Sequence, residues 1–194
     1  MSSRAPGRVL DLVLLLPLLP AFAVVIGALA ALVWLTDGRP LFFSQPRVGR
    51  HRRPFRIWKL RTMTTEANVS ARRPTRLGAW LRHRGLDELP QLFNVLRGDM
   101  RLVGPRPLES RDADRLVAQH GPFAARFEVA PGLTGLAQVC QAQGVQLTAR
   151  VDAEYATSRS TWLDLSILLR TAFMNVVGKT RGKRPLPASL ERVG

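Results

Sequence analysis

The sequence predicts an α+β fold that is mostly helical, with an N-terminal re-entrant membrane helix followed by a cytoplasmic domain that contains a short β-hairpin and interfacial amphipathic helices. Three observations predict it. Residues 9–35 are almost wholly apolar, and roughly 20 such residues can cross a bilayer. Two later segments alternate as strands do, and several stretches place apolar residues at helical spacing. The predicted boundaries are 1–38 for the membrane helix, 39–178 for the domain and 179–194 for a basic tail.

The flanks of the apolar run predict its topology. Arg4 and Arg8 precede it, and a dense group of basic residues follows it. Positive charge on both sides draws both ends towards the cytoplasm. A helix bent at Pro17 or Pro20 satisfies both flanks by entering and leaving through one face. An ordinary single-pass anchor is the alternative, whereas the length of the run argues against a cleaved signal peptide.

Residues 40–49 and 54–63 are predicted to pair as a hairpin around an arginine-rich tip at 49–52. We expect the second strand to have one basic face and the tip to bind anionic lipid headgroups. Lys59 and Arg61 lie on the strand that leads towards the acidic residues described next. Residues 64–75 are polar and are predicted to form a loop.

Two adjacent carboxylates, Asp87 and Glu88, follow a predicted helix over 77–84. We expect Asp87 to cap a second helix that ends at Gly98. Backbone N–H groups and the positive helix end would then gather anions beside both carboxylates. The apolar residues of this helix have i, i+3, i+4, i+7 spacing and predict one buried face: Leu89, Leu92, Phe93 and Leu96. A plain helix cap with a first-turn acid is the alternative interpretation.

The C-terminal third is predicted to be helical and amphipathic. A helix over 111–127 should break at His120–Pro122, and a further helix covers 162–177. The apolar side of that last helix either packs on the core, which we favour, or lies in the membrane interface. From its position in the first turn, Asp164 is a candidate cap of this helix.

The net charge of the chain limits the classes of binding partner that the sequence favours. The chain of 194 residues has a net charge of +15, with basic residues that are nearly all arginine, which favours anionic partners. These include anionic phospholipid, phosphorylated substrates and nucleic acid. A membrane-tethered nucleic-acid binder would need aromatic stacking platforms among its basic residues, and support for these is thin, so we predict no nucleic acid. A lone cysteine, Cys140, excludes an internal disulfide.

Five motifs occur in a fixed order and together resemble the monotopic phosphoglycosyl transferases, a family of bacterial sugar transferases. They are residues 59–63 (KLRTM), 86–92 (LDELPQL), 98–100 (GDM), 102–107 (LVGPRP) and 131–138 (PGLTGLAQ). The resemblance implies transfer of a sugar-1-phosphate from a UDP-sugar to polyprenyl (undecaprenyl) phosphate. It implies release of UMP, at the cytoplasmic face of the bacterial inner membrane, at the start of glycoconjugate or exopolysaccharide assembly.

The resemblance also implies roles for individual residues. Asp87 would be the nucleophile of a covalent phospho-sugar enzyme and Glu88 its partner, with Mg²⁺ held by both carboxylates. A carboxylate attacking phosphorus needs neutralised phosphate oxygens, which a hard cation and arginines provide. The residues expected to contact substrate are Lys59, Arg61, Arg82, Pro105, Arg106, Pro107 and Gln138.

Three positions depart from the family pattern. Ala23-Val24 stands where Ser-Pro is usual at the membrane break, and Gly85 replaces a serine. Cys140-Gln141-Ala142 replaces a Gly-Arg that would help to contact the donor. The sequence therefore leaves open the sugar, the polyprenyl length, the pathway and the oligomeric state, including a homodimer. A catalytically weakened family member is the alternative.

Overall fold

The computed structural model describes residues 6–177, which form helices around two small sheets. The α-helices are α1 (Pro6–Asp37), α2 (Arg76–Arg84), α3 (Leu92–Arg97), α4 (Ser110–Gln119), α5 (Leu136–Val139), α6 (Val145–Ser158) and α7 (Thr161–Val177). The strands are β1 (Phe42–Val48), β2 (Pro54–Leu60), β3 (Arg101–Val103) and β4 (Gly132–Thr134). The 3₁₀-helices are η1 (Arg50–Arg52), η2 (Val69–Ala71), η3 (Leu86–Gln91) and η4 (Gly121–Glu128). The prediction of a mostly helical α+β fold is confirmed, and the predicted basic tail, 179–194, lies outside the described residues.

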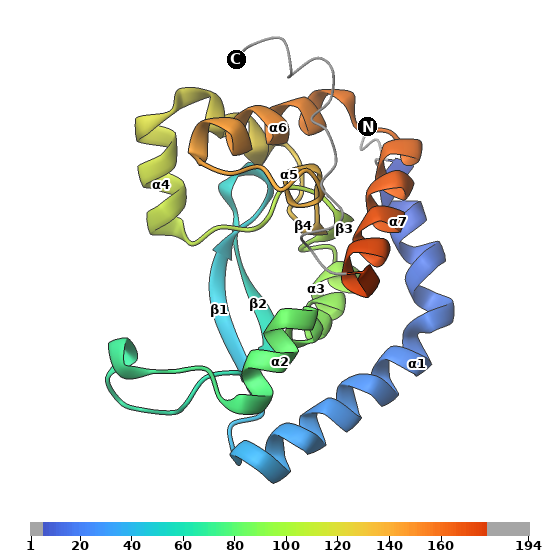
Figure 1. Cartoon of the computed structure of the whole chain (residues 1–194). Helices are drawn as coiled ribbons and strands as arrows, with labels where there is room; N and C mark the ends of the chain where they lie inside the picture. The colour runs from blue at the N-terminus through green and yellow to red at the C-terminus, as the bar shows by residue number, and fades with distance from the viewer. Residues whose placement is uncertain (1–5, 178–194) are drawn as a thin grey trace.

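The long helix α1 runs along one side of the molecule (Figure 1). It has 32 residues and is long and apolar enough to cross a membrane, judged by length and composition alone. Its ribbon is bent along its length (Figure 1), and the helix contains two prolines, Pro17 and Pro20. A proline removes an intrahelical hydrogen bond and clashes with the preceding turn, so we attribute the bend to these two residues.

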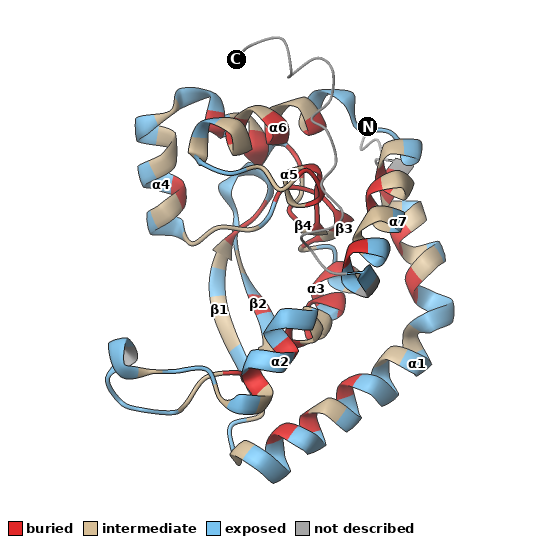
Figure 2. Cartoon of the chain, viewed as in Figure 1, coloured by how far each residue is buried: buried red, intermediate tan, exposed pale blue. Residues whose placement is uncertain are grey.

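Only a narrow stripe of α1 is buried (Figure 2). Leu15 and Ile26 lie in this stripe, and Ala30 and Val33 pack with Leu60 of β2 in a small apolar cluster. Most of the remaining surface of α1 is apolar and exposed, and it includes Val9, Val13, Leu16, Leu18, Val24, Val25, Leu32, Trp34 and Leu35. A continuous apolar surface of this kind indicates contact with lipid or with another protein.

The hairpin of β1 and β2 is confirmed, with an antiparallel register that pairs Phe43 with Lys59. Its tip does not extend freely, because it contacts α4 and η4, and the binding of anionic lipid headgroups by this tip stays a prediction. Arg52 forms an ion pair with Asp114 of α4, and Arg50 donates to the carbonyl of Glu128 at 3.0 Å. Nor does β2 have one basic face, because Arg56 and Lys59 are three residues apart and point to opposite sides.

The helix predicted over 77–84 is confirmed as α2, whose N-cap Thr75 accepts a hydrogen bond from the amide of Gly78. Gly98 ends α3 in the left-handed conformation, as predicted. Two other expectations for this region are wrong. Asp87 is not an N-cap, because it lies inside η3, and Phe93 is half exposed, because the shift from a 3₁₀-helix to α3 turns Asn94 and Val95 inward instead.

The parallel pair β3–β4 holds the loop that contains Arg106. The amide of Gly104 donates to the carbonyl of Thr134 at 2.8 Å, and the amide of Gly132 donates to the carbonyl of Pro105 at 2.9 Å. A Cβ on Gly104 would lie 2.4 Å from the carbonyl oxygen of Ala130, so this close approach requires glycine. The loop therefore leaves the core from a fixed point.

The C-terminal helices cover the main core. The predicted break at His120 is confirmed between α4 and η4, and α7 buries Ile167 and Met174, as core packing predicted. The opposite side of α7 exposes Trp162, Leu169 and Phe173. The last described helix therefore has apolar residues on both its packed side and its exposed side.

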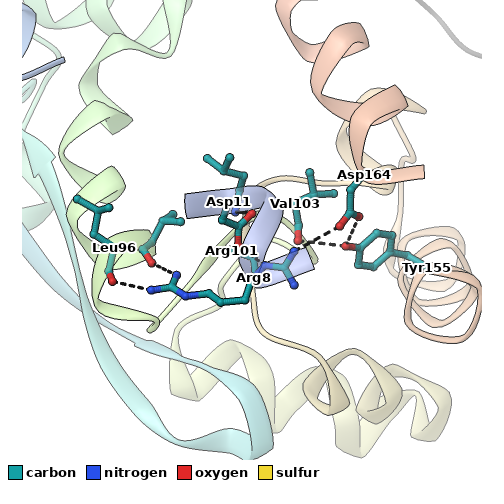
Figure 3. Close-up of polar contacts among 9 residues, drawn as sticks. Arg8, Asp11, Leu96, Arg101, Val103, Tyr155 and Asp164 are labelled. Carbon is teal, nitrogen blue, oxygen red and sulfur yellow. Dashed lines mark hydrogen bonds and ion pairs between the residues drawn. The ribbon is translucent and has the colours of Figure 1, made fainter. Parts of the chain in front are cut away.

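A buried polar cluster fastens the start of α1 to the rest of the fold (Figure 3). Arg101 forms an ion pair with Asp11 of α1 and another with Asp164 of α7. The hydroxyl of Tyr155 donates to Asp164 at 2.7 Å. Asp164 thus does not cap its helix as one expectation had it, since its carboxylate is engaged by Arg101 and Tyr155.

Candidate active site

Asp87 and Glu88 lie on η3, which is pressed against β2. Gly85, with φ of 70°, ends α2 and begins η3, and this left-handed conformation favours glycine. Asp87 is 6% exposed and the side chain of Glu88 is 17% exposed. The sharp turn at Gly85 therefore places two carboxylates in a largely desolvated position.

Glu88 is held by two cations from different elements. Nζ of Lys59 on β2 lies 2.6 Å from Oε1 of Glu88, and Nη2 of Arg106 lies 2.5 Å from the same oxygen. Nη1 of Arg106 lies 3.4 Å from Oε2. Burial alone would raise the pKa of Glu88, but Arg106 and Lys59 outweigh it and hold the pKa below its usual value. Glu88 is therefore ionised over the physiological range.

Asp87 has the opposite environment. No hydrogen bond or ion pair joins its carboxylate to another side chain among residues 6–177. Burial, followed by the negative charge of Glu88, raises the pKa of Asp87, and the charges of Lys59 and Arg82 offset this only in part. Two neighbouring carboxyl groups with pKa values moved in opposite directions indicate different chemical roles. Asp87 is the less constrained of the two, because Lys59 and Arg106 hold Glu88.

The carboxylates fit a magnesium ion only together with a ligand that supplies further oxygens. Within the described part of the chain, no group of three or more His, Cys, Asp or Glu side chains could hold a metal. Mg²⁺ takes six oxygen ligands and is often bound by one or two carboxylates plus substrate phosphates and water. Asp87 has free oxygens for such an ion, whereas Glu88 would have to loosen a contact with Lys59 or Arg106.

Some predicted contact residues gather here. Arg82 lies close enough for its charge to lower the pKa of Asp87, and its Nη1 lies 3.1 Å from Sδ of Met63. Pro105, which is buried, and Pro107, which is half-buried, flank Arg106, whose side chain is 50% exposed. The structure thus brings Lys59, Arg82 and Arg106 together around the two carboxylates.

Arg61 and Gln138 do not join this group. Arg61 is buried and donates to the carbonyls of Asp37, Gly38 and Arg39 at the end of α1. It satisfies carbonyls that the helix leaves unpaired, so we omit it from the proposed site. The Nε2 of Gln138 lies 3.4 Å from the carbonyl of Leu133, so this side chain contacts the turn between β4 and α5.

Two residues near the site were not identified from the sequence. Arg126 of η4 and Asp152 of α6 form a buried ion pair, and Nη2 of Arg126 lies 2.5 Å from the carbonyl oxygen of Arg106. The one signal in the sequence was a charged residue among apolar neighbours, Arg126 between Phe123 and Phe127 and Asp152 beside Val151. Nothing local indicates that the two charges meet.

An apolar helix joined to a domain that presents paired carboxylates among cations is compatible with an enzyme that acts on anionic substrates. The family described as bacterial sugar transferase matches residues 2–178, and the chain belongs to this family of transferases. This confirms the resemblance predicted from the five motifs and favours the enzyme over the nucleic-acid binder.

The chain is similar to several curated proteins. It is 42% identical over 179 residues to a UDP-glucose:undecaprenyl-phosphate glucose-1-phosphate transferase of Caulobacter vibrioides, covering 84% of this chain and 67% of that protein. It is 40% identical over 172 residues to the uncharacterized sugar transferase EpsL of Bacillus subtilis, covering 84% of each. It is 35% identical over 177 residues to a UDP-N-acetylgalactosamine-undecaprenyl-phosphate N-acetylgalactosaminephosphotransferase of Aeromonas hydrophila, covering 84% of this chain and 42% of that protein.

Proposed function

We propose that the protein transfers a sugar-1-phosphate from a UDP-sugar to undecaprenyl phosphate and releases UMP. The observation that supports this most directly is the pair of carboxylates with different environments, Glu88 held by Lys59 and Arg106 and Asp87 left unpaired. The names of the Caulobacter and Aeromonas relatives share the UDP donor and the undecaprenyl acceptor but differ in the sugar. The sugar is therefore the part that the family leaves undecided.

In the proposed mechanism, a carboxylate oxygen of Asp87 attacks the β-phosphorus of the UDP-sugar. The bond from this phosphorus to the bridging oxygen breaks, and UMP leaves with the bond's electron pair. A phosphate oxygen of the acceptor then attacks the same phosphorus and frees Asp87. A bound Mg²⁺ would neutralise phosphate oxygens, and Asp87 and Glu88 would be its protein ligands. Because the transfer is divided into two displacements, a water-soluble donor and a lipid acceptor can react one after the other.

The surrounding cations favour the first step. Arg82 and Arg106 present planar groups of N–H donors that match phosphate oxygens. Arg106 is half exposed and already faces Glu88, so it can contact an incoming diphosphate with little reorganisation. Glu88 in turn keeps Lys59 and Arg106 beside the reacting phosphorus.

We further propose that α1 dips into the cytoplasmic face of the inner membrane and returns, without crossing it. Near its start, Arg8 donates to the carbonyl of Leu96 at 2.6 Å, and Asp11 pairs with Arg101. At its end, Arg61 donates to three carbonyls of residues 37–39. Because both ends contact the same domain, a straight crossing would require one set of contacts to break. The bend and the exposed apolar side agree with a shallow course through lipid (Figure 2).

The test is release of UMP from a panel of UDP-sugars by the purified protein with undecaprenyl phosphate and Mg²⁺. One sugar should support release that depends on the acceptor. With labelled donor and no acceptor, labelled sugar phosphate should remain bound to the protein and be absent from Asp87→Asn. Lack of release from every sugar in the panel would contradict the proposed activity.

A further inference from the structure

The Arg126–Asp152 ion pair is among the most buried charges of the described chain. The side chains of Arg126 and Asp152 are 4% and 3% exposed, and Nη1 of Arg126 lies 3.3 Å from Oδ2 of Asp152. The guanidinium carbon lies 4.6 Å from the ring centroid of Phe123. A buried ion pair adds little net stability over apolar side chains of similar volume. Stability therefore does not by itself account for this pair.

The contacts of Arg126 lead to the candidate active site. Its Nη2 lies 2.5 Å from the backbone carbonyl oxygen of Arg106, and the guanidinium of Arg106 lies 2.5 Å from Glu88. A continuous series of contacts thus runs from Asp152 through Arg126 and the backbone of Arg106 to Glu88. It joins α6 and η4, which are packed together, to a loop that carries a substrate-facing arginine.

Beyond its anchor on β4, this loop has few backbone donors of its own near Arg106. Arg106 lies between Pro105 and Pro107, and neither proline has a backbone N–H. The residue that follows the carbonyl of Arg106 is Pro107, which has no N–H to donate to a neighbouring strand. The fixed fork of a guanidinium that is itself paired can hold this carbonyl in one direction.

We propose that Arg126 and Asp152 are positioning residues that fix the backbone of Arg106 and thereby aim its side chain at Glu88. The proposal rests on the proposed function of the Asp87–Glu88 site. Arg126 acts on the reaction only through Arg106. Burial raises the pKa of Asp152 to about 6 against the opposing charge of Arg126, which agrees with a charge retained at a cost in stability.

The first experiment measures positioning without any reaction. Arg126→Gln and Asp152→Asn should speed hydrogen exchange in peptides that cover 104–109 by about tenfold, as expected when a hydrogen bond to a charged group is lost. Val151→Ala is the matched control, because it removes buried volume from α6 beside Asp152 and leaves both charges. It should lower stability without a selective effect on 104–109. Unchanged exchange of 104–109 in both charge variants overturns the proposal, whatever the enzyme does.

The second experiment tests whether the effect passes through Arg106. Arg126→Gln should lower kcat/KM for the UDP-sugar about 10-fold or more in the parent, and less than about twofold in an Arg106→Ala background. The same factor in both backgrounds would show an independent structural effect and overturn the proposal.

Different results would contradict the proposed function and the positioning role of Arg126 and Asp152. A parent enzyme that releases no UMP contradicts the proposed function, and the exchange experiment still decides the positioning role. If Arg126→Gln does not accumulate as folded protein, Asp152→Asn takes its place in both experiments. It keeps the guanidinium and removes the charge that orients it, so the same results support or overturn the proposal.

Discussion

Asp87→Asn should stabilise the protein while it abolishes transfer. Asp87 is 6% exposed and its carboxylate pairs with no other side chain among residues 6–177, and burial and then the charge of Glu88 raise its pKa. Asparagine has nearly the same shape and no charge, so it avoids the cost of an uncompensated buried carboxylate. We expect a gain of about 1 kcal/mol at neutral pH, or about 2–4 °C in Tm for a chain of this length.

The pH dependence gives the sharper test. The folded-state pKa of Asp87 lies above the ordinary value of 3.8, so its protonation stabilises the folded state in acid. This contribution is lost as the pH rises through the raised pKa, and asparagine has no such loss. The advantage of Asp87→Asn should therefore be absent in acid and grow towards neutral pH, measured by thermal unfolding in detergent over a pH series.

Glu88→Gln is the matched control with the opposite sign. The pKa of Glu88 is lowered, so its stabilising contribution is present at neutral pH and is lost as the pH falls through the folded-state value. Glu88→Gln should be less stable than the parent at neutral pH and approach it in acid. If Asp87→Asn is also destabilised at neutral pH, or if its curve runs parallel to that of the parent, the argument from burial is refuted.

Four further predictions concern the metal, the membrane, the donor and the end of α1. Excess chelator should abolish UMP release, and added Mg²⁺ should restore it; full activity in chelator would contradict the proposed metal. Cysteines at Ser3 and Ser44 should react with an impermeant reagent from the same side of intact vesicles, and labelling from opposite sides would indicate a crossing. Arg106→Ala should lower kcat/KM for the donor at least about tenfold. Because Glu88 loses a cation, its pKa should rise and the acid limb of the pH–rate profile should move to higher pH. Unchanged donor kinetics would assign Arg106 to structure. Arg61→Met should destabilise the protein by about 1.5–3 kcal/mol in thermal unfolding, since three carbonyls at the end of α1 lose a charged donor, and no change in Tm would contradict its assignment as a cap.

Local chemistry made part of the fold predictable. Alternation over 54–63 predicted β2, the break at His120 separated α4 from η4, and Gly98 ended α3. Each of these signals acts within a few residues, so a sequence is sufficient to show it. The two carboxylates and Arg106 could likewise be selected from contiguous motifs, and their roles in the reaction stay predictions.

The errors arose where a distant partner decides the conformation. The helical spacing that placed Phe93 inside assumed one regular helix, whereas packing against β2 imposed a 3₁₀ turn before α3. Arg61 was assigned to substrate because of its motif, but the end of α1, more than twenty residues earlier, takes up its donors. The ion pairs of Asp11 and Asp164 with Arg101 join residues whose separation no sequence pattern indicates.

The position of Arg61 bears on the distance between the candidate active site and the end of α1. Lys59 contacts Glu88, and Arg61 donates to the carbonyl of Arg39, just beyond the end of α1, so one extended segment joins the candidate site to the end of this apolar helix. Two residues of extended chain span about 6–7 Å. In the proposed function, this segment sets how far the candidate site lies from the end of α1. One residue inserted between Lys59 and Arg61 would lengthen this segment and also turn one of the two side chains to the opposite face.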